Sequence, residues 1–177
     1  MIRVAKSQIK VGVTNKVLSW LALKRRVAAW RRAGHRIVFT NGCFDLLHPG
    51  HVRYLQAAKR LGDKLVVGIN SDGSVRRLGK APGRPLVPQG ARAEVVAALE
   101  GVDAVVIFDQ PTPLDLIRVV QPDVLVKGGD WTPERIIGAD VVRARGGTVR
   151  SLRFVPGYST TTLVKRIAAA DRPPERK

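Results

Sequence analysis

The stretch RIVFTNGCFDLLHPGH, residues 36–51, joins an apolar run to a Pro-Gly pair with a histidine on either side. Residues 36–40 have the composition of a buried strand, and a helix is expected from Gly50 to about residue 61, closed by Gly62. His48 and His51 would then lie where a strand passes into a helix, beside unpaired backbone N–H groups. That arrangement is typical of a phosphate-binding edge of an α/β sheet.

The same alternation continues along the chain. Further apolar runs predict strands over 64–70, 104–108, 123–127 and 148–154. Helical patterns between them predict helices over 19–33, 89–100, 113–120, 133–144 and 160–170. We therefore expect an α/β fold: a Rossmann-like, doubly wound, mainly parallel five-stranded sheet with helices on both faces.

Length and composition fit one domain. The chain has 177 residues, of which 45% are hydrophobic and 25% charged. We expect a single domain over 16–170, a poorly ordered N-terminal segment over 1–15 and a charged tail over 171–177, with no internal repeat. No apolar run is long enough to span a bilayer, and the first residues lack a secretory signal. The single cysteine, Cys43, excludes an internal disulfide, so a cytoplasmic protein without a membrane partner is expected.

The net charge of +17 favours a polyanionic partner. Nucleic acid is one candidate, but nucleotides and sugar phosphates fit as well. The cations are spread along the chain, and the few aromatic residues form no RNA-binding pattern. We expect a basic solvated surface and no nucleic-acid partner, and keep a basic nucleic-acid-binding module as the less favoured alternative.

The histidine pair is the first candidate for catalysis. Imidazoles at a helix N-terminus can donate hydrogen bonds to phosphoryl oxygens, and Gly50 allows a phosphate to approach the backbone. A His-x-x-His pair could also bind a metal ion. That alternative is weaker, because no third His, Cys or carboxylate cluster accompanies the pair. We therefore expect no metal site built from protein residues.

Three stretches together resemble the cytidylyltransferase-like nucleotidyltransferases: residues 40–51, Gly128-Gly129-Asp130-Trp131 and Ser159-Thr160-Thr161. The resemblance extends from about Lys16 to Ile167. Within that superfamily, the details are similar to the adenylyltransferases that make ADP-heptose, which occur alone or fused behind a sugar kinase. No kinase-like domain accompanies the stretch, so the resemblance favours the stand-alone form.

The resemblance implies a reaction and a set of site residues. AMP would pass from ATP to D-glycero-β-D-manno-heptose 1-phosphate, giving ADP-heptose and pyrophosphate for the lipopolysaccharide inner core. His48, His51 and Lys127 would be catalytic. The implied nucleotide-binding residues are Thr40, Asn41, Gly42, Phe44, Gly50, Arg92, Gly128, Asp130, Ser159, Thr160 and Thr161. Mg²⁺ is expected as cofactor, held mainly by the phosphates. A homo-oligomer is expected, with a dimer favoured.

Several of these residues have a structural alternative. Asp45 could contact ligand, but we expect it to cap the loop before the histidines. The hydroxyl groups at 159–161 could cap the last helix as well as bind phosphates. Trp131 could simply cover its loop.

Residues 72–88 are rich in glycine and proline and carry four cations: Arg76, Arg77, Lys80 and Arg84. We interpret this segment as a mobile flap that closes over the phosphates; the alternative is a solvated basic loop. A related nucleotidyltransferase with another acceptor, such as glycerol 3-phosphate with CTP, remains the second enzyme hypothesis.

Overall fold

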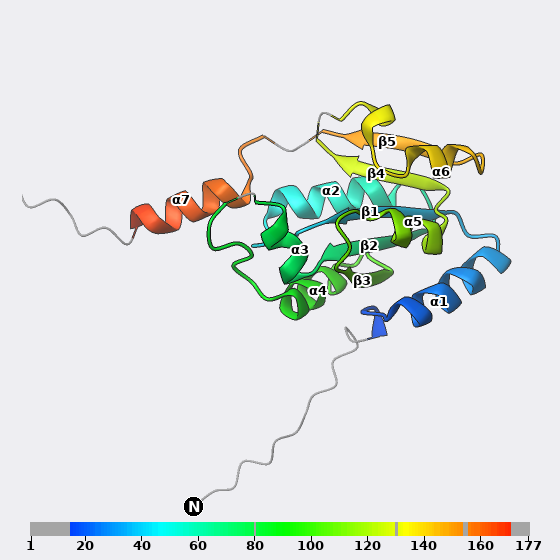
Figure 1. The fold of residues 1–177 in the computed structure, drawn as a ribbon, viewed down its shortest axis with the longest axis horizontal. Coiled ribbons are helices and arrows are strands. Elements are labelled where there is room, and N and C mark those ends of the chain that lie inside the picture. The colour runs from blue at the N-terminus through cyan, green and yellow to red at the C-terminus, as the bar shows by residue number, and fades with distance from the viewer. Residues whose placement is uncertain (1–14, 80, 130, 154–155, 171–177) are drawn as a thin grey trace, which may run out of the picture.

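The computed structural model describes residues 15–79, 81–129, 131–153 and 156–170 (Figure 1). Most of the predicted segments 1–15 and 171–177 therefore lies outside the described residues, as do Lys80 and Asp130. The elements, in chain order, are α1 (Trp20–Arg32), β1 (Ile37–Gly42), α2 (Pro49–Lys59), β2 (Lys64–Asn70), α3 (Asp72–Arg77), α4 (Gln89–Ala97), β3 (Ala104–Phe108), α5 (Leu114–Val120), β4 (Val124–Gly128), η2 (Pro133–Arg135), α6 (Ala139–Arg143), β5 (Thr148–Leu152) and α7 (Thr160–Ala170).

The five predicted strands form one sheet in the order β3-β2-β1-β4-β5. Each neighbouring pair is parallel, so the expected fold class is confirmed. The chain order runs outward from β1 to β3 on one side, then from β4 to β5 on the other. The order in which strands are added therefore reverses between β1 and β4, and we call this place the switch point. Ligands of open α/β sheets bind beyond the carboxyl ends of the strands at such a point.

Helices cover both faces of the sheet (Figure 1). Because side chains alternate along a strand, Phe39 packs into one core and its neighbour Val38 into the other. Helices α1, α5 and α6 contribute to the core that contains Phe39, and α2 and α4 to the core that contains Val38. Each core holds fully buried aliphatic side chains from three or more strands, so both faces fix the sheet that carries the site.

Helix α1 lies within the predicted range 19–33. The Ser19 side chain accepts a hydrogen bond from Ala22 N at 3.3 Å, which satisfies one of the free N–H groups at the helix start. Leu23 and Val27 are buried, and the tryptophans Trp20 and Trp30 pack against the same core. The two tryptophans are therefore packing residues.

Two element predictions were wrong in part. Residues 72–77 form α3 rather than a loop, because the Ser71 side chain accepts a hydrogen bond from Ser74 N at 2.9 Å and caps the helix. The helix expected over 133–144 is divided into η2 and α6. Gly138, with φ of 84°, has the left-handed conformation just before α6.

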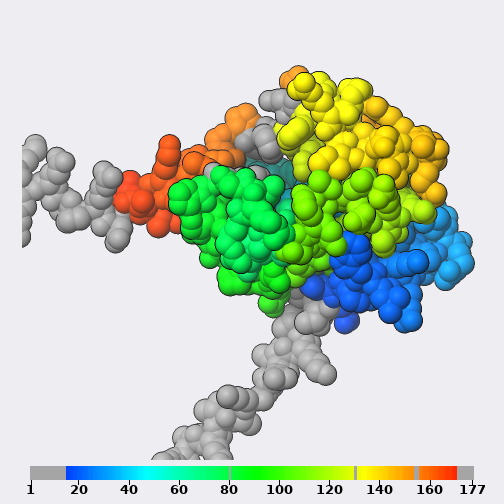
Figure 2. All heavy atoms as spheres, in the orientation of Figure 1, coloured from blue at the N-terminus to red at the C-terminus, as the bar shows by residue number. Residues whose placement is uncertain are grey.

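The last helix, α7, has the predicted bounds. It stands away from the rounded body formed by the sheet and the other helices (Figure 2), and none of its described residues is buried. Among the described residues, no helix has the length and apolar character needed to cross a membrane.

Candidate active site

The two histidines stack on each other where β1 leads into α2. His48 is the residue before the helix, Pro49 fills the first helical position, and no side chain caps the helix start. The ring centroids of His48 and His51 lie 3.8 Å apart with 21° between the planes. A Cβ atom on Gly50 would lie 3.0 Å from His48 Nδ1, so glycine leaves room for this ring. The pair is thus fixed at an uncapped, electropositive helix end.

Burial keeps both imidazoles neutral near pH 7. It lowers the pKa of His51 to about 4, assisted by the neighbouring His48 and the Arg84 cation and opposed by the Asp45 carboxylate. Burial also lowers the pKa of His48. The Nδ1 atoms of both rings are buried without a hydrogen-bond partner among the described residues. Buried polar atoms are normally paired, so the arrangement suits a ligand that brings hydrogen-bonding oxygens.

The lowered pKa of His51 predicts a loss of stability in mild acid. The unfolded chain protonates this histidine near its ordinary pKa of 6.5, whereas the folded chain does so only near 4. Between those values the unfolded state binds more protons, so the free energy of unfolding falls as the pH falls. Urea unfolding at pH 7 and pH 5 measures the change.

His51→Gln should flatten that dependence, because the residue no longer titrates. His35→Gln, which removes the histidine outside the pair, serves as the control. An equal pH dependence in wild type and His51→Gln would contradict the buried neutral imidazole.

Lys127 lies across the switch point from the histidine loop. It is near the end of β4, and its Nζ is 3.5 Å from Asn41 Oδ1 near the end of β1. Gly129 follows, with φ of 114°, and its N–H donates to Leu152 O at 2.9 Å. The structure therefore places Lys127 and the glycine turn at the expected edge of the sheet, while Asp130 lies outside the described residues.

Most of the other residues of the stretch 40–51 are buried or half-buried and pack beneath the edge of the sheet where the histidines lie. Thr40 is fully buried, and its hydroxyl lies 2.6 Å from the Tyr54 hydroxyl. Phe44 is also buried, with its ring centroid 5.4 Å from that of His51. A Cβ on Gly42 would be only 3.1 Å from the Phe44 ring. These residues hold the histidine loop in place, whatever contact they make with a nucleotide.

The hydroxyl-bearing stretch 159–161 contacts the loop that carries the histidines. Thr160 Oγ1 donates to the backbone oxygen of Asp45 at 2.8 Å. Ser159 Oγ accepts from Thr162 N at 3.0 Å, so its expected capping role at α7 is present. Thr161 is exposed. The first and third motifs, far apart in sequence, are therefore in direct contact.

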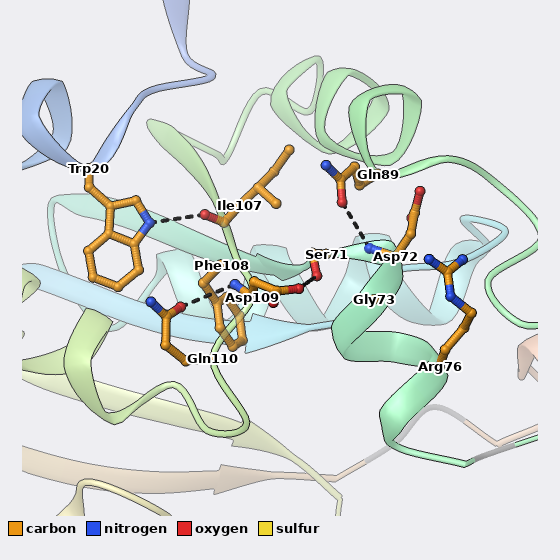
Figure 3. Close-up of a pocket in the computed structure, with 10 residues that line it drawn as sticks. All are labelled: Trp20, Ser71, Asp72, Gly73, Arg76, Gln89, Ile107, Phe108, Asp109 and Gln110. Atoms are coloured by element: carbon orange, nitrogen blue, oxygen red, sulfur yellow. Dashed lines mark hydrogen bonds between the residues drawn. The ribbon is translucent and has the colours of Figure 1, made fainter.

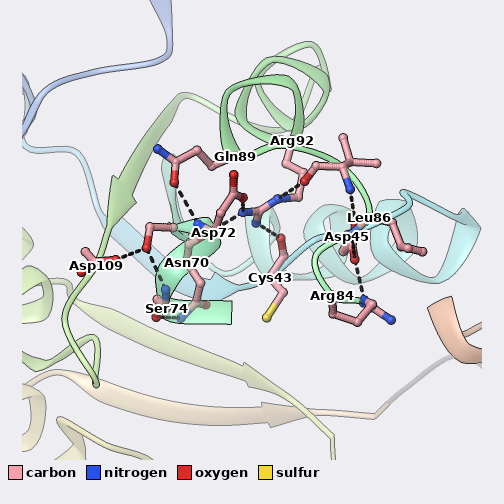
Figure 4. Close-up of polar contacts among 12 residues, drawn as sticks. Cys43, Asp45, Asn70, Asp72, Ser74, Arg84, Leu86, Gln89, Arg92 and Asp109 are labelled. Carbon is pink, nitrogen blue, oxygen red and sulfur yellow. Dashed lines mark hydrogen bonds and ion pairs between the residues drawn. The ribbon is translucent and has the colours of Figure 1, made fainter. Parts of the chain in front are cut away.

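Arg92, which the resemblance implies to be a nucleotide-binding residue, has its polar groups engaged within the protein. Its side chain is buried beneath the edge, and its guanidinium donates to the carbonyl oxygens of Val87, Cys43 and Asn70 and to Asp72 Oδ1 (Figure 4). These contacts join the histidine loop to the end of β2 and the start of α4. In this structure Arg92 is part of the scaffold of the site.

The cations assigned to a mobile flap do not lie on one free loop. Arg76 and Arg77 belong to α3, and Arg77 pairs with Asp109 at 3.0 Å. Arg84 lies 2.5 Å from the buried carboxylate of Asp45, which also accepts from the backbone N–H groups of Leu86 and Val87. The structural role expected for Asp45 is confirmed, although the segment it fixes is 84–87 rather than the loop before the histidines.

A hollow of about 640 Å³ lies beside the ends of β2 and β3 (Figure 3), and neither His48 nor His51 is among the residues that line it. Its walls are internally bonded: Trp20 Nε1 donates to Ile107 O, Asp72 N donates to Gln89 Oε1, and Ser71 contacts Asp109. The buried side-chain nitrogens without a hydrogen-bond partner among the described residues lie elsewhere, on His48, His51 and Arg84. No group of three or more His, Cys, Asp or Glu side chains suited to a metal occurs among the described residues.

Sequence reasoning missed two features of this site. The helix signal at Ser71, a capping serine followed by an acidic residue, was present but hidden in a glycine-rich context. The partnership between Asp45 and Arg84 had no local signal, because its members are far apart in the chain.

The chain is similar in sequence to a known protein family and to several known proteins. Residues 39–166 match the family model described as cytidylyltransferase-like. The bifunctional protein HldE of Magnetococcus marinus is 51% identical over 156 residues, 88% of this chain and 32% of that protein. HldE of Syntrophotalea carbinolica is 58% identical over 137 residues, 77% of this chain and 28% of that protein. The chain thus spans about a third of the length of these relatives.

A solved structure is also similar. It is described as the lipopolysaccharide core biosynthesis protein from Thermoplasma volcanium, with a TM-score of 0.56 and 30% sequence identity. The alignment covers 69% of this chain and 98% of the other. The similarity therefore extends from sequence to fold.

Proposed function

Since this chain belongs to the cytidylyltransferase-like family and is a nucleotidyltransferase, we propose that it transfers AMP from ATP to D-glycero-β-D-manno-heptose 1-phosphate. An oxygen of the sugar phosphate attacks the α-phosphorus of ATP. The bond from that phosphorus to the β-phosphate oxygen breaks, and ADP-heptose and pyrophosphate form. The motif details at residues 40–51, 124–131 and 159–161 support this acceptor, as does the similar protein described as acting in lipopolysaccharide core biosynthesis.

The observation that carries the proposal is the stacked histidine pair at the uncapped start of α2. A neutral imidazole supplies one N–H donor, and two such donors suit oxygens of the α-phosphate. Charge on these oxygens grows as the new bond forms, so fixed donors stabilise the transition state more than the ground state. No covalent enzyme intermediate is needed, and the site acts by positioning and charge.

Lys127 supports the same transfer from the opposite side of the switch point. Its ammonium is a compact cation on a strand end, suited to a phosphate oxygen. The negative triphosphate would in turn favour protonation of the histidines, so ATP binding should raise their lowered pKa values.

We propose that the divalent cation is held mainly by the triphosphate. Mg²⁺ keeps several waters and usually binds through substrate phosphates, so a cation that arrives with its nucleotide needs few protein ligands. Mg²⁺ would neutralise part of the phosphate charge when bound. The imidazoles and Lys127 bind and orient the phosphates in either case.

Substrate choice tests the proposal. We expect pyrophosphate release to be fastest with ATP and heptose 1-phosphate, in a panel that crosses ATP and CTP with several sugar 1-phosphates and glycerol 3-phosphate. The reason is the resemblance of residues 40–51, 124–131 and 159–161 to the enzymes that make ADP-heptose. Faster release from CTP with glycerol 3-phosphate would favour the second enzyme hypothesis instead.

A further inference from the structure

Asp45 is a buried carboxylate that the proposed chemistry does not use. Its side chain is fully buried and faces three groups of one segment: the Arg84 guanidinium and the backbone N–H groups of Leu86 and Val87 (Figure 4). The two N–H groups donate to Asp45 at 2.9 and 3.0 Å. A carboxylate is rarely buried unless it is paired in this way.

The backbone around Asp45 is strained. Phe44 and Leu46, on either side of it, have φ of 48° and 51°, the left-handed region that side chains other than glycine seldom adopt. Such strain persists only where surrounding contacts hold it, and it is common at functional sites. Here the contacts are those of the Asp45 carboxylate together with the bond from Thr160 to its backbone oxygen.

Arg84 forms an ion pair with Asp45, and its Nε makes no hydrogen bond within the described residues. Its Nε lies 2.5 Å from Asp45 Oδ2, but the geometry does not make a hydrogen bond. Among the described residues, the buried side-chain nitrogens and oxygens without a hydrogen-bond partner are His48 Nδ1, His51 Nδ1 and Arg84 Nε. These three atoms belong to one neighbourhood, because Arg84 pairs with Asp45, which lies in the loop that carries the histidines. The Arg84 charge accordingly contributes to the lowered pKa of His51.

We propose that Asp45 is a positioning residue that fixes Arg84 beside the histidine pair, where the guanidinium binds the same triphosphate as His48 and His51. This inference rests on the proposed function for its ligand. Anchored at three points, the segment 84–87 is a fixed strap rather than a flap. Arginine suits this task because its planar fork can meet a carboxylate on one side and phosphate oxygens on another.

Turnover of single and double variants tests the pairing. We expect Arg84→Gln to lower kcat by ~10²–10³, as for loss of one donor to a developing charge. Asp45→Asn keeps the shape but frees the guanidinium, and a misplaced group should cost ~10². The double variant should lose clearly less than the two single losses combined, because Asp45 acts mainly through Arg84. Additive losses, or an Arg84→Gln protein with wild-type kcat, would overturn the proposal.

A measurement on the nucleotide-free protein distinguishes a positioning role of Arg84 from a role in stability alone. Histidine NMR titration of the nucleotide-free protein should show a higher His51 pKa in Arg84→Gln, because a neighbouring cation is lost. The other charged or titratable groups facing His51, namely His48 and Asp45, remain in that variant. Arg118→Gln removes the same charge from an exposed pair with Asp115 and is the matched control. An unmoved His51 pKa would place Arg84 away from the pair.

Two further measurements test the inference if Asp45→Asn does not fold or if the proposed function is wrong. If Asp45→Asn does not fold, the Arg84 Nε–H signal of the wild type decides: exchange with water as fast as that of Arg118 overturns the positioning. If the wild type makes no ADP-heptose, the proposed function fails, and ATP affinity by calorimetry still tests the inference. Equal ATP affinities of wild type and Arg84→Gln in that case would overturn it.

Discussion

His48→Ala and His51→Ala are each expected to lower kcat by ~10²–10³ while the protein remains folded. Each variant removes one N–H donor from the place where charge develops on the α-phosphate. The double variant should lose little more than either single one, because the stacked rings act on the same phosphate and each orients the other. Pyrophosphate release at saturating ATP and acceptor measures the effect.

The control for these variants is His35→Ala, which removes a histidine outside the pair. Circular dichroism and urea unfolding establish that the rings, rather than the fold, account for the loss. Turnover within a few-fold of wild type in either His48→Ala or His51→Ala would contradict the assignment of the pair as catalytic.

Arg92→Met is expected to lower the free energy of unfolding by ~3–5 kcal/mol. The substitution leaves the carbonyl oxygens of Val87, Cys43 and Asn70 without their donor beneath the site, and it also removes the partner of the half-buried Asp72 carboxylate. Such groups are costly when buried and unpaired. Urea unfolding at pH 7 gives the change, and kcat should fall only as far as the histidine loop loosens.

Arg143→Met provides a matched comparison. It removes an arginine from an exposed pair with Glu134, which should cost at most about 1 kcal/mol. If Arg92→Met instead unfolds like the wild type and mainly raises the KM for ATP, then Arg92 contacts the nucleotide phosphates as the sequence resemblance implies.

The sheet could be predicted because its signals are local. A continuous apolar run such as residues 64–70 is typical of a strand buried on both faces, and the alternation with helices fixes the parallel arrangement. The same order placed His48, His51 and Lys127 at the edge where β1 and β4 end, and the structure has them there. Motif positions at strand ends follow directly from topology.

The polar framework beneath that edge could not be predicted, because its partners are distant in sequence. Arg92 was expected to face ligand, yet it reaches back to Cys43 and Asn70, and nothing near Arg92 in the sequence specifies these contacts. Likewise the basic composition of 72–88 suggested a free loop. Three-dimensional contacts with Asp45 and Asp109 instead engage Arg84 and Arg77.

Helix boundaries within glycine-rich segments were uncertain for a different reason. Helix α3 is short and depends on the Ser71 cap, whose contribution of about 1 kcal/mol is largely offset by the unfavourable helix propensity of Gly73. At Gly138 the structure has a helix break where the sequence predicts one continuous helix, because this residue has the left-handed conformation. A Cβ at Gly138 would lie 2.7 Å from the Ile117 side chain, so tertiary packing also requires glycine there.

Transfer of AMP to a sugar 1-phosphate is tested most directly by following the acceptor oxygen. Heptose 1-phosphate labelled with ¹⁸O in its phosphate is incubated with unlabelled ATP and the wild-type protein, and the products are analysed by mass spectrometry. The proposed attack on the α-phosphorus predicts ADP-heptose that carries all of the label, together with unlabelled pyrophosphate. Label in pyrophosphate, or no ADP-heptose at all, would contradict it.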